Sequence, residues 1–150
     1  MGFLTKEIAE QAISIVAPAI EAMFNTGLVK RKALAVAVLQ VGSFDVLASG
    51  SFGGAPMDWG REFNAFAEKK AALAQRTKMD TLEVAHRFPH LFELGDCKYP
   101  GGVYRDGIAV GASGIDWWLD QMVAEMVAAA CKALCIGKAR ELLADSAPYV

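Results

Sequence analysis

The spacing of apolar residues predicts a helix at the start of the chain. After Thr5, a predicted N-cap, apolar residues recur at helical spacing as far as Met23. The tripeptide Asn25–Gly27 is typical of a helix end. Pro18 falls inside this span and predicts a kink or break just before it.

Two β-hairpins are predicted in the rest of the chain. Residues 33–41 and 44–52 are rich in strand-forming residues and are separated by Gly42-Ser43. The second hairpin surrounds Asp106-Gly107, a dipeptide that favours a two-residue turn. A further short strand is predicted at His90–Leu94. Consecutive hairpins require an antiparallel sheet.

Three more helices are predicted around these strands. One runs from about Trp59 to Thr77 with Asp58 as its cap, and a short second one ends at Phe88, before Pro89. The last runs from Trp117 to about Gly137, after capping groups at residues 113–116. Because no linker or repeat interrupts the chain, we expect residues 1–150 to form one domain. The predicted class is α/β (α+β), an antiparallel sheet flanked by helices.

Composition narrows the possible partners. The chain has 150 residues, of which 54% are hydrophobic, and a net charge of −2, so neither nucleic acid nor an anionic membrane surface is an expected partner. The short basic run Lys30-Arg31-Lys32 is interpreted as a solvated strand entry. A mean hydropathy of +0.28 favours a homo-oligomer that covers apolar surface. No membrane span or signal peptide is predicted, and three cysteines do not suggest a disulfide framework, so a cytoplasmic location is expected.

The segment "KYPGGVYRDGIAVGASGIDWW" has the glycine content of a phosphate loop but not its spacing. It lacks GxxxxGK[ST], and its glycines do not lie between a parallel strand and a helix. We therefore interpret them as turn and close-packing glycines. One functional alternative stays open, since the amides from Gly114 to Trp117 open a helix and could bind an anion.

Three segments carry a family resemblance. "PGGVYRDGIAVGASGIDWWLDQMVAEMV" resembles the glycine-hairpin signature of the GlcG/HbpS-like haem-degrading domain family. "FNAFAEKKAALAQRT" is similar to the KAxTA helix of that family, and "ALAVAVLQVGSFDVLASG" to its first hairpin. The resemblance spans roughly Ala33 to Ala130 and implies a profilin-like α/β/α fold, homo-oligomers, and haem binding or breakdown in some members. Leu73 replaces the motif threonine, and Gln40 replaces an aspartate that often ends the first strand.

Lys70 is the most informative candidate residue. It falls near the middle of an apolar helix stripe, where an ammonium group requires a partner or a route to water. It is either a structural ion pair or an anion clamp for a carboxylate or a haem propionate. By resemblance it matches the family's lysine, and Asp120 matches the family's aspartate, which would act as a dipole partner or as the mate of Lys70. The predicted ligand-binding residues are Lys70, Gly101, Gly102, Ser113, Gly114 and Asp120.

Possible haem ligands are few. His86 and His90 are the only histidines, and Cys97 precedes the glycine hairpin. For each of the three, a surface or structural role is the alternative. Cys131 and Cys135 lack the spacing of a metal site and are predicted to pack in the core. Trp117 and Trp118 cannot both face the core, so one is expected at a subunit interface or a pocket rim.

The sequence thus predicts a protein that binds haem or another flat, anionic small molecule, while assistance in haem degradation is implied by the family alone. Two alternatives stay open: an enzyme acting on a small carboxylate or hydroxy acid, and a non-catalytic accessory subunit of a catabolic pathway. No GxSxG elbow supports hydrolase chemistry. No metal site is expected.

Overall fold

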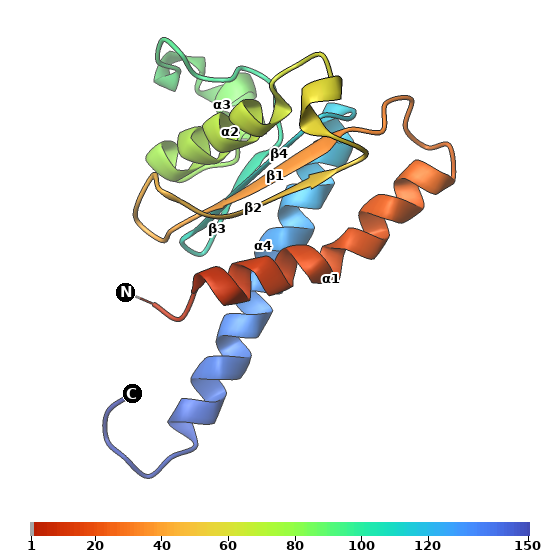
Figure 1. Ribbon diagram of the computed structural model, residues 1–150. Helices are drawn as coiled ribbons and strands as arrows, with labels where there is room; N and C mark the ends of the chain where they lie inside the picture. The colour runs from red at the N-terminus through yellow and green to blue at the C-terminus, as the bar shows by residue number, and fades with distance from the viewer. Residues whose placement is uncertain (1) are drawn as a thin grey trace.

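A four-stranded antiparallel sheet forms the middle layer of the computed structural model, which describes residues 2–150 (Figure 1). The strand order is β2-β1-β4-β3, so the two hairpins lie side by side with β1 and β4 in the centre. The strands are β1 (Leu34–Leu39), β2 (Val46–Phe52), β3 (Gly102–Arg105) and β4 (Ile108–Ser113).

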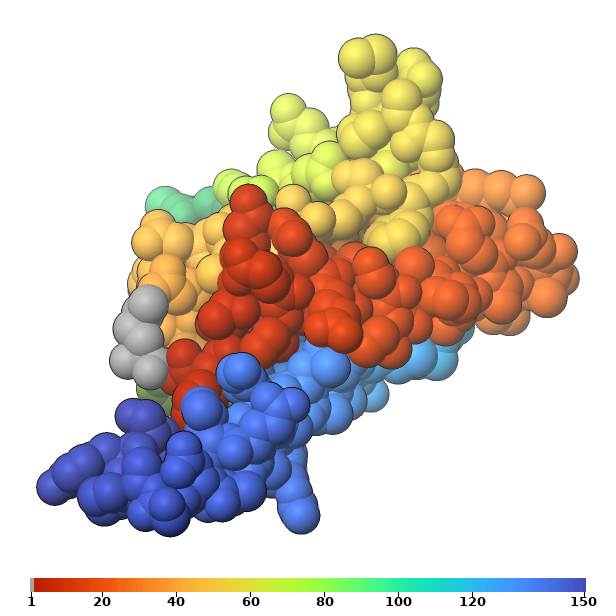
Figure 2. All heavy atoms as spheres, turned by 60° about the horizontal axis from the view of Figure 1, so that its bottom comes forward, coloured from red at the N-terminus to blue at the C-terminus, as the bar shows by residue number. Residues whose placement is uncertain are grey.

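Helices cover both faces of the sheet (Figure 1). The helices α1 (Lys6–Asn25) and α4 (Trp117–Leu143) lie on one face, and α2 (Phe63–Thr77) and α3 (Thr81–Arg87) lie on the other. Figure 2 shows α1 and α4 against each other, with the end of α4 projecting beyond α1. This is the predicted α/β/α arrangement. Within residues 2–150, no helix is both long and apolar enough to cross a membrane.

The two faces of β1 differ in residue size, and this sets how closely the helices approach. Leu34, Val36 and Val38 pack into the large core formed with α1 and α4. On the other face, Ala35 and Ala37 pack against α2. Because alanine leaves little volume between the layers, α2 lies close to the sheet, and this position constrains the neighbouring strand β4.

Both predicted hairpins are confirmed. In the second, Asp106 and Gly107 adopt φ angles of 52° and 92°, the positive values that a tight turn of this kind requires. In the first, the connection from Leu39 to Val46 is wider than predicted and includes Gly42 at φ 74°. The pairing shifts register between Val38 and Leu39.

The strand predicted at His90–Leu94 is wrong. Residues Pro89–Leu91 form a short 3-10 helix, and the chain then continues as a loop to β3. Arg76 on α2 holds this loop, because its guanidinium makes two hydrogen bonds to Asp96, at 3.1 and 2.7 Å, and a third to the Leu91 carbonyl. These contacts hold the loop against α2, and its backbone does not pair with a strand.

Helix ends follow the sequence only in part. Thr5 caps α1 as predicted, accepting a hydrogen bond from the Ile8 amide at 3.2 Å. α1 is not broken at Pro18, which lies on the exposed side where water can reach the carbonyl that proline leaves without a donor. Asp58 does not cap α2: it ends the 3-10 helix Pro56–Asp58, and α2 begins later, at Phe63.

The last helix also departs from its predicted form. α4 continues past Gly137 to Leu143, and its N-cap, Asp116, makes no side-chain capping hydrogen bond. Its first turn nevertheless starts where the sequence places it, at Trp117. The extra length projects beyond the sheet (Figure 1).

A buried ion pair joins α2 to β4 and α4. Lys70 is 1% exposed, and its Nζ donates to the Ala112 carbonyl at 2.9 Å and contacts Asp120 Oδ2 at 3.4 Å. Asp120 is 3% exposed and its Oδ1 accepts from the Ile115 amide at 3.2 Å. Gly101 leaves room for this pair, since a Cβ at that position would lie 3.0 Å from the Lys70 Nζ.

We expect Gly111→Ala to destabilise the fold by about 1–3 kcal/mol or more, because overpacking forces the layers apart. A Cβ on Gly111 would lie 1.9 Å from the Ala67 carbonyl oxygen of α2. Urea denaturation measures the effect. The matched control is Gly137→Ala on α4, where a Cβ meets nothing within 4 Å and the substitution stabilises a helix by up to about 1 kcal/mol. Equal stabilities for the two variants would contradict the close packing of α2 on β4.

We expect Lys70→Met to cost about 3 kcal/mol of unfolding free energy, because it leaves a buried carboxylate without its charged partner. Adding Asp120→Asn should recover about 1 kcal/mol or more, since the amide oxygen still accepts from Ile115 without carrying a charge. Lys69→Met, on the exposed neighbour, removes only a surface hydrogen bond to the Gly95 carbonyl and should cost about 1 kcal/mol or less. Strictly additive costs for Lys70→Met and Asp120→Asn would show that the pair is not coupled.

Candidate functional site

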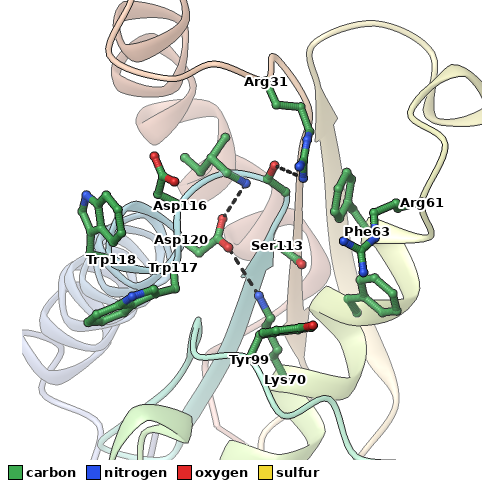
Figure 3. Close-up of a pocket in the computed structure, with 13 residues that line it drawn as sticks. Arg31, Arg61, Phe63, Lys70, Tyr99, Ser113, Asp116, Trp117, Trp118 and Asp120 are labelled. Atoms are coloured by element: carbon green, nitrogen blue, oxygen red, sulfur yellow. Dashed lines mark hydrogen bonds and ion pairs between the residues drawn. The ribbon is translucent and has the colours of Figure 1, made fainter.

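A cavity of about 280 Å³ lies where β4 ends and α4 begins (Figure 3). Its walls come from the segment before β1, the start of α2, the loop before β3 and the first turn of α4. The lining residues are Arg31, Arg61, Phe63, Phe66, Lys70, Tyr99, Ser113, Gly114, Ile115, Asp116, Trp117, Trp118 and Asp120.

One side of the cavity carries two arginines that lie on phenylalanine rings. The guanidinium carbon of Arg31 is 5.0 Å from the centre of the Phe63 ring, and that of Arg61 is 5.8 Å from the centre of the Phe66 ring. Arg31 also donates to the Gly114 carbonyl at 3.1 Å. None of the ion pairs found within residues 2–150 involves either arginine. Their charges therefore face the cavity without a carboxylate partner.

The opposite side is aromatic. Trp117 and Trp118 lie across the cavity from the arginines, with their ring centroids 5.8 Å apart and their planes at 89° (Figure 3). Both residues are substantially exposed, at 43% and 54%. Tyr99 lies along the floor, with its hydroxyl at the end away from Trp117 (Figure 3). Neither tryptophan faces the core, and both stand on the rim of the cavity.

The turn between β4 and α4 shapes the inner end of the cavity. Gly114 has a φ of 142°, and a Cβ there would lie 2.1 Å from the Ala33 carbonyl oxygen. Only glycine fits such an approach, so the chain can turn directly from the buried Ser113 into α4. This turn brings the start of α4 to the Lys70–Asp120 pair.

The carboxyl of Asp120 titrates above its ordinary range. Burial raises the pKa of Asp120 from 3.8 to about 6, although the Lys70 ammonium and the amides of Ile115 and Gly114 act in the opposite direction. At neutral pH the group is mainly ionised and compensates the charge of Lys70. The pair is thus a proton-sensitive contact at the inner wall of the cavity.

The structure brings together four of the six predicted ligand-binding residues. Lys70, Ser113, Gly114 and Asp120 line the cavity, as does the start of α4 with Trp117. Gly101 and Gly102 do not line it. Their amides bind the hydroxyl of Thr81 at 3.2 and 2.9 Å, and they keep space free for Lys70. Whether the four lining residues bind a ligand stays a prediction.

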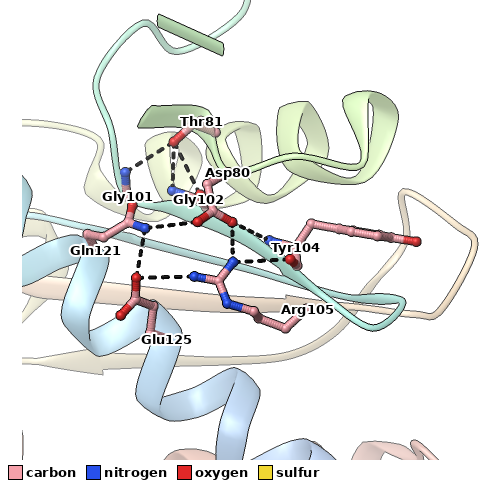
Figure 4. Close-up of polar contacts among 8 residues, drawn as sticks. All are labelled: Asp80, Thr81, Gly101, Gly102, Tyr104, Arg105, Gln121 and Glu125. Carbon is pink, nitrogen blue, oxygen red and sulfur yellow. Dashed lines mark hydrogen bonds and ion pairs between the residues drawn. The ribbon is translucent and has the colours of Figure 1, made fainter. Parts of the chain in front are cut away.

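A polar network next to these glycines fixes α4 relative to β3 (Figure 4). Asp80 accepts from the Tyr104 amide at 3.1 Å, from Arg105, and from Gln121 on α4 at 3.3 Å. Gln121 and Arg105 both donate to Glu125, one turn further along α4. Since Asp120 and Gln121 are neighbours, the network also positions the buried carboxylate.

The three predicted haem ligands do not line the cavity. His86 lies on α3 in a shallow hollow that also includes Asp80 and Glu83. His90 is exposed and contacts Phe88 edge to face, and Cys97 is buried. Residues 2–150 contain no cluster of three or more His, Cys, Asp or Glu side chains that could hold a metal ion.

The cysteines of α4 are placed largely as predicted. Cys131 is fully buried, and burial raises the pKa of its thiol to about 12. Cys135 is half-buried. A thiol with such a raised pKa stays protonated and does not act as a nucleophile at neutral pH.

Sequence reasoning missed Arg31 and Arg61. From the sequence, Arg31 is interpreted as part of a solvated basic run, and Arg61 falls in the first turn of the helix predicted from about Trp59 to Thr77. For Arg61 the available signal was its position shortly before Phe63 and Phe66, because arginine forms cation–π contacts with aromatic rings. Arg31 gives no such signal, because its partner Phe63 is far along the chain.

Comparison with family models and with curated protein sequences finds no match. Solved structures do match. HbpS shares 27% identity over 86% of this chain and 90% of its own, with a TM-score of 0.64. Klebsiella pneumoniae protein ORFY shares 21% identity over 89% of this chain and 93% of its own, with a TM-score of 0.58.

A complex of PduOC with haem shares 19% identity over 87% of this chain and 94% of its own, also with a TM-score of 0.58. These matches cover nearly the whole of each chain, so the likeness extends to the complete sheet and its helices rather than to one motif. The chain therefore has the profilin-like α/β/α fold of the GlcG/HbpS-like proteins, and the resemblance that its sequence carries is confirmed.

Proposed function

We propose that this protein binds a planar, anionic small molecule in the cavity at the start of α4, with haem as the leading candidate. The proposal is carried by one observation: one wall of the cavity has two arginines without carboxylate partners, and the opposite wall has two exposed tryptophans. Guanidinium groups bind carboxylates, and aromatic faces stack on flat rings. A ligand with an acidic edge and a flat face satisfies both walls.

Haem has this shape, with two propionates on one edge of a flat macrocycle. Arg31 and Arg61 would hold the propionates, and Trp117, Trp118 and Tyr99 would cover part of the ring. Bound haem would supply redox-active iron. The haem complex of PduOC, which shares the fold, supports the choice of haem.

The size of the cavity limits how much of a ligand is enclosed. A volume of about 280 Å³ is near the lower end of the range of about 300–1,000 Å³ that is typical of sites for drug-sized ligands. A second hollow shares Arg61 and Phe63 with the cavity and extends toward Pro56 and Trp59. A macrocycle would thus be only partly enclosed by the walls of the cavity.

At neutral pH the buried Lys70–Asp120 pair should contribute little to anion binding, which would depend mainly on the arginines. Asp120 compensates Lys70 when it is ionised, so Lys70 adds little positive charge to the cavity at neutral pH. Protonation of Asp120 removes that compensation. Anion binding should then become stronger, and by linkage a bound anion should raise the pKa of Asp120 further.

We expect haemin to bind with a saturable shift of its Soret band, and Arg61→Gln to weaken binding by about tenfold or more, because a charged hydrogen bond contributes about 1.5–3 kcal/mol. Arg31→Gln should act in the same direction. The matched control is Arg87→Gln, an exposed arginine on α3 that pairs with Glu83 and lies outside the cavity. A haemin spectrum identical to that of free haemin at all protein concentrations would refute the haem proposal and favour a small organic acid as ligand.

We expect the affinity for naphthalene-2-sulfonate, whose charge is constant, to rise as the pH falls from about 8 to about 5, since Asp120 becomes neutral below its raised pKa. Quenching of tryptophan fluorescence measures binding. Asp120→Asn should bind the sulfonate more tightly at high pH and lose most of the pH dependence. As a comparison, Asp116→Asn removes an exposed carboxylate that also lines the cavity, so it can change the affinity at every pH but should keep the pH dependence. The same pH profile in wild type and Asp120→Asn would contradict the role of the pair.

A further inference from the structure

The side chains that line the cavity determine which parts of a porphyrin could be recognised. Haem iron in proteins is held by histidine, cysteine, methionine or tyrosine side chains. Among the thirteen lining residues there is no histidine, cysteine or methionine. The cavity thus offers groups for the acidic edge and the flat face of a porphyrin, and almost none for its metal.

Tyr99 is the one residue of these four types in the lining, and the Lys70 amine is a further nitrogen donor; both are poorly placed to bind iron. The Lys70 ammonium is already bound to the Ala112 carbonyl and to Asp120, and the residue is 1% exposed. Tyr99 is 49% exposed and lies along the floor of the cavity, with its hydroxyl directed away from Trp117 (Figure 3). Its ring is suited to contact a flat ligand, whereas its oxygen lies at the far end.

We propose that the cavity recognises a porphyrin by its two carboxylates and its ring face rather than by its metal, so that iron-free protoporphyrin IX binds as tightly as haemin. This inference rests on the proposed function, since it concerns the same cavity. It adds the class of ligand: dicarboxylic porphyrins with or without a metal. Arg31 and Arg61 set the affinity through the carboxylates, and the aromatic wall sets the preference for a flat ring.

The test compares haemin, zinc protoporphyrin, protoporphyrin IX and its dimethyl ester on the wild-type protein, by quenching of tryptophan fluorescence. We expect the dissociation constants of the first three to agree within about threefold, and that of the dimethyl ester to be higher by about tenfold or more. The ester keeps the ring and removes both negative charges, so it isolates the contribution of the arginines. Arg61→Gln should weaken the three dicarboxylic porphyrins equally.

A second measurement addresses the only tyrosine on the wall. Tyr99→Phe keeps the ring and removes the oxygen, so it should leave the position of the Soret band of bound haemin unchanged. The inference is overturned if protoporphyrin IX binds more weakly than haemin by about tenfold or more, or if Tyr99→Phe shifts the Soret band of bound haemin.

The failures of the two proposals are distinguishable. If haemin binds but protoporphyrin IX does not, the iron is essential, so this inference is wrong and the proposed function stands. Variants His86→Ala, His90→Ala and Cys97→Ala would then identify the ligand. If none of the porphyrins binds, both proposals are wrong.

Discussion

The buried contact between Lys70 and Asp120 is the constraint on which the other features of this fold depend. Two charges that are almost completely removed from water are tolerated only when every remaining donor and acceptor is satisfied. The Ala112 carbonyl and the Ile115 amide supply these contacts, so the end of β4 and the start of α4 must stay beside α2. The glycines of the signature segment follow from that approach, since Gly101 has no space for a Cβ.

The sequence predicted the layers and the inner wall of the site because these depend on local patterns. Turn residues at Asp106-Gly107 and the helical spacing around Lys70 are short-range signals, and both led to the observed elements. The strand predicted at His90–Leu94 shows the limit of such signals. Its apolar residues could pair with a sheet, but the contact between Arg76 and Asp96 holds that loop on α2 instead. No local pattern records a contact of that kind.

The arginines of the cavity were hidden for a related reason. A basic residue outside a regular element is usually solvated, and nothing in the neighbourhood of Arg31 distinguishes it from Lys30 or Lys32. Its position next to the Phe63 ring and the Gly114 carbonyl arises only when α2 and the start of α4 have packed on the sheet. The side of the cavity that carries the arginines thus forms only in the tertiary structure. The position of Lys70 on the inner wall, by contrast, could be predicted from the helical spacing of its neighbours.

The two walls also differ in what they can contribute to binding. The inner pair is nearly neutral and buried, so it positions the backbone and responds to pH through Asp120. The two arginines on the other side of the cavity, Arg31 and Arg61, lie over phenylalanine rings, and neither forms an ion pair within residues 2–150. If the proposed function is correct, such a site would distinguish ligands by the number and spacing of their negative charges. The aromatic wall would add affinity for any flat ring, so discrimination between flat acids would depend on Arg31 and Arg61.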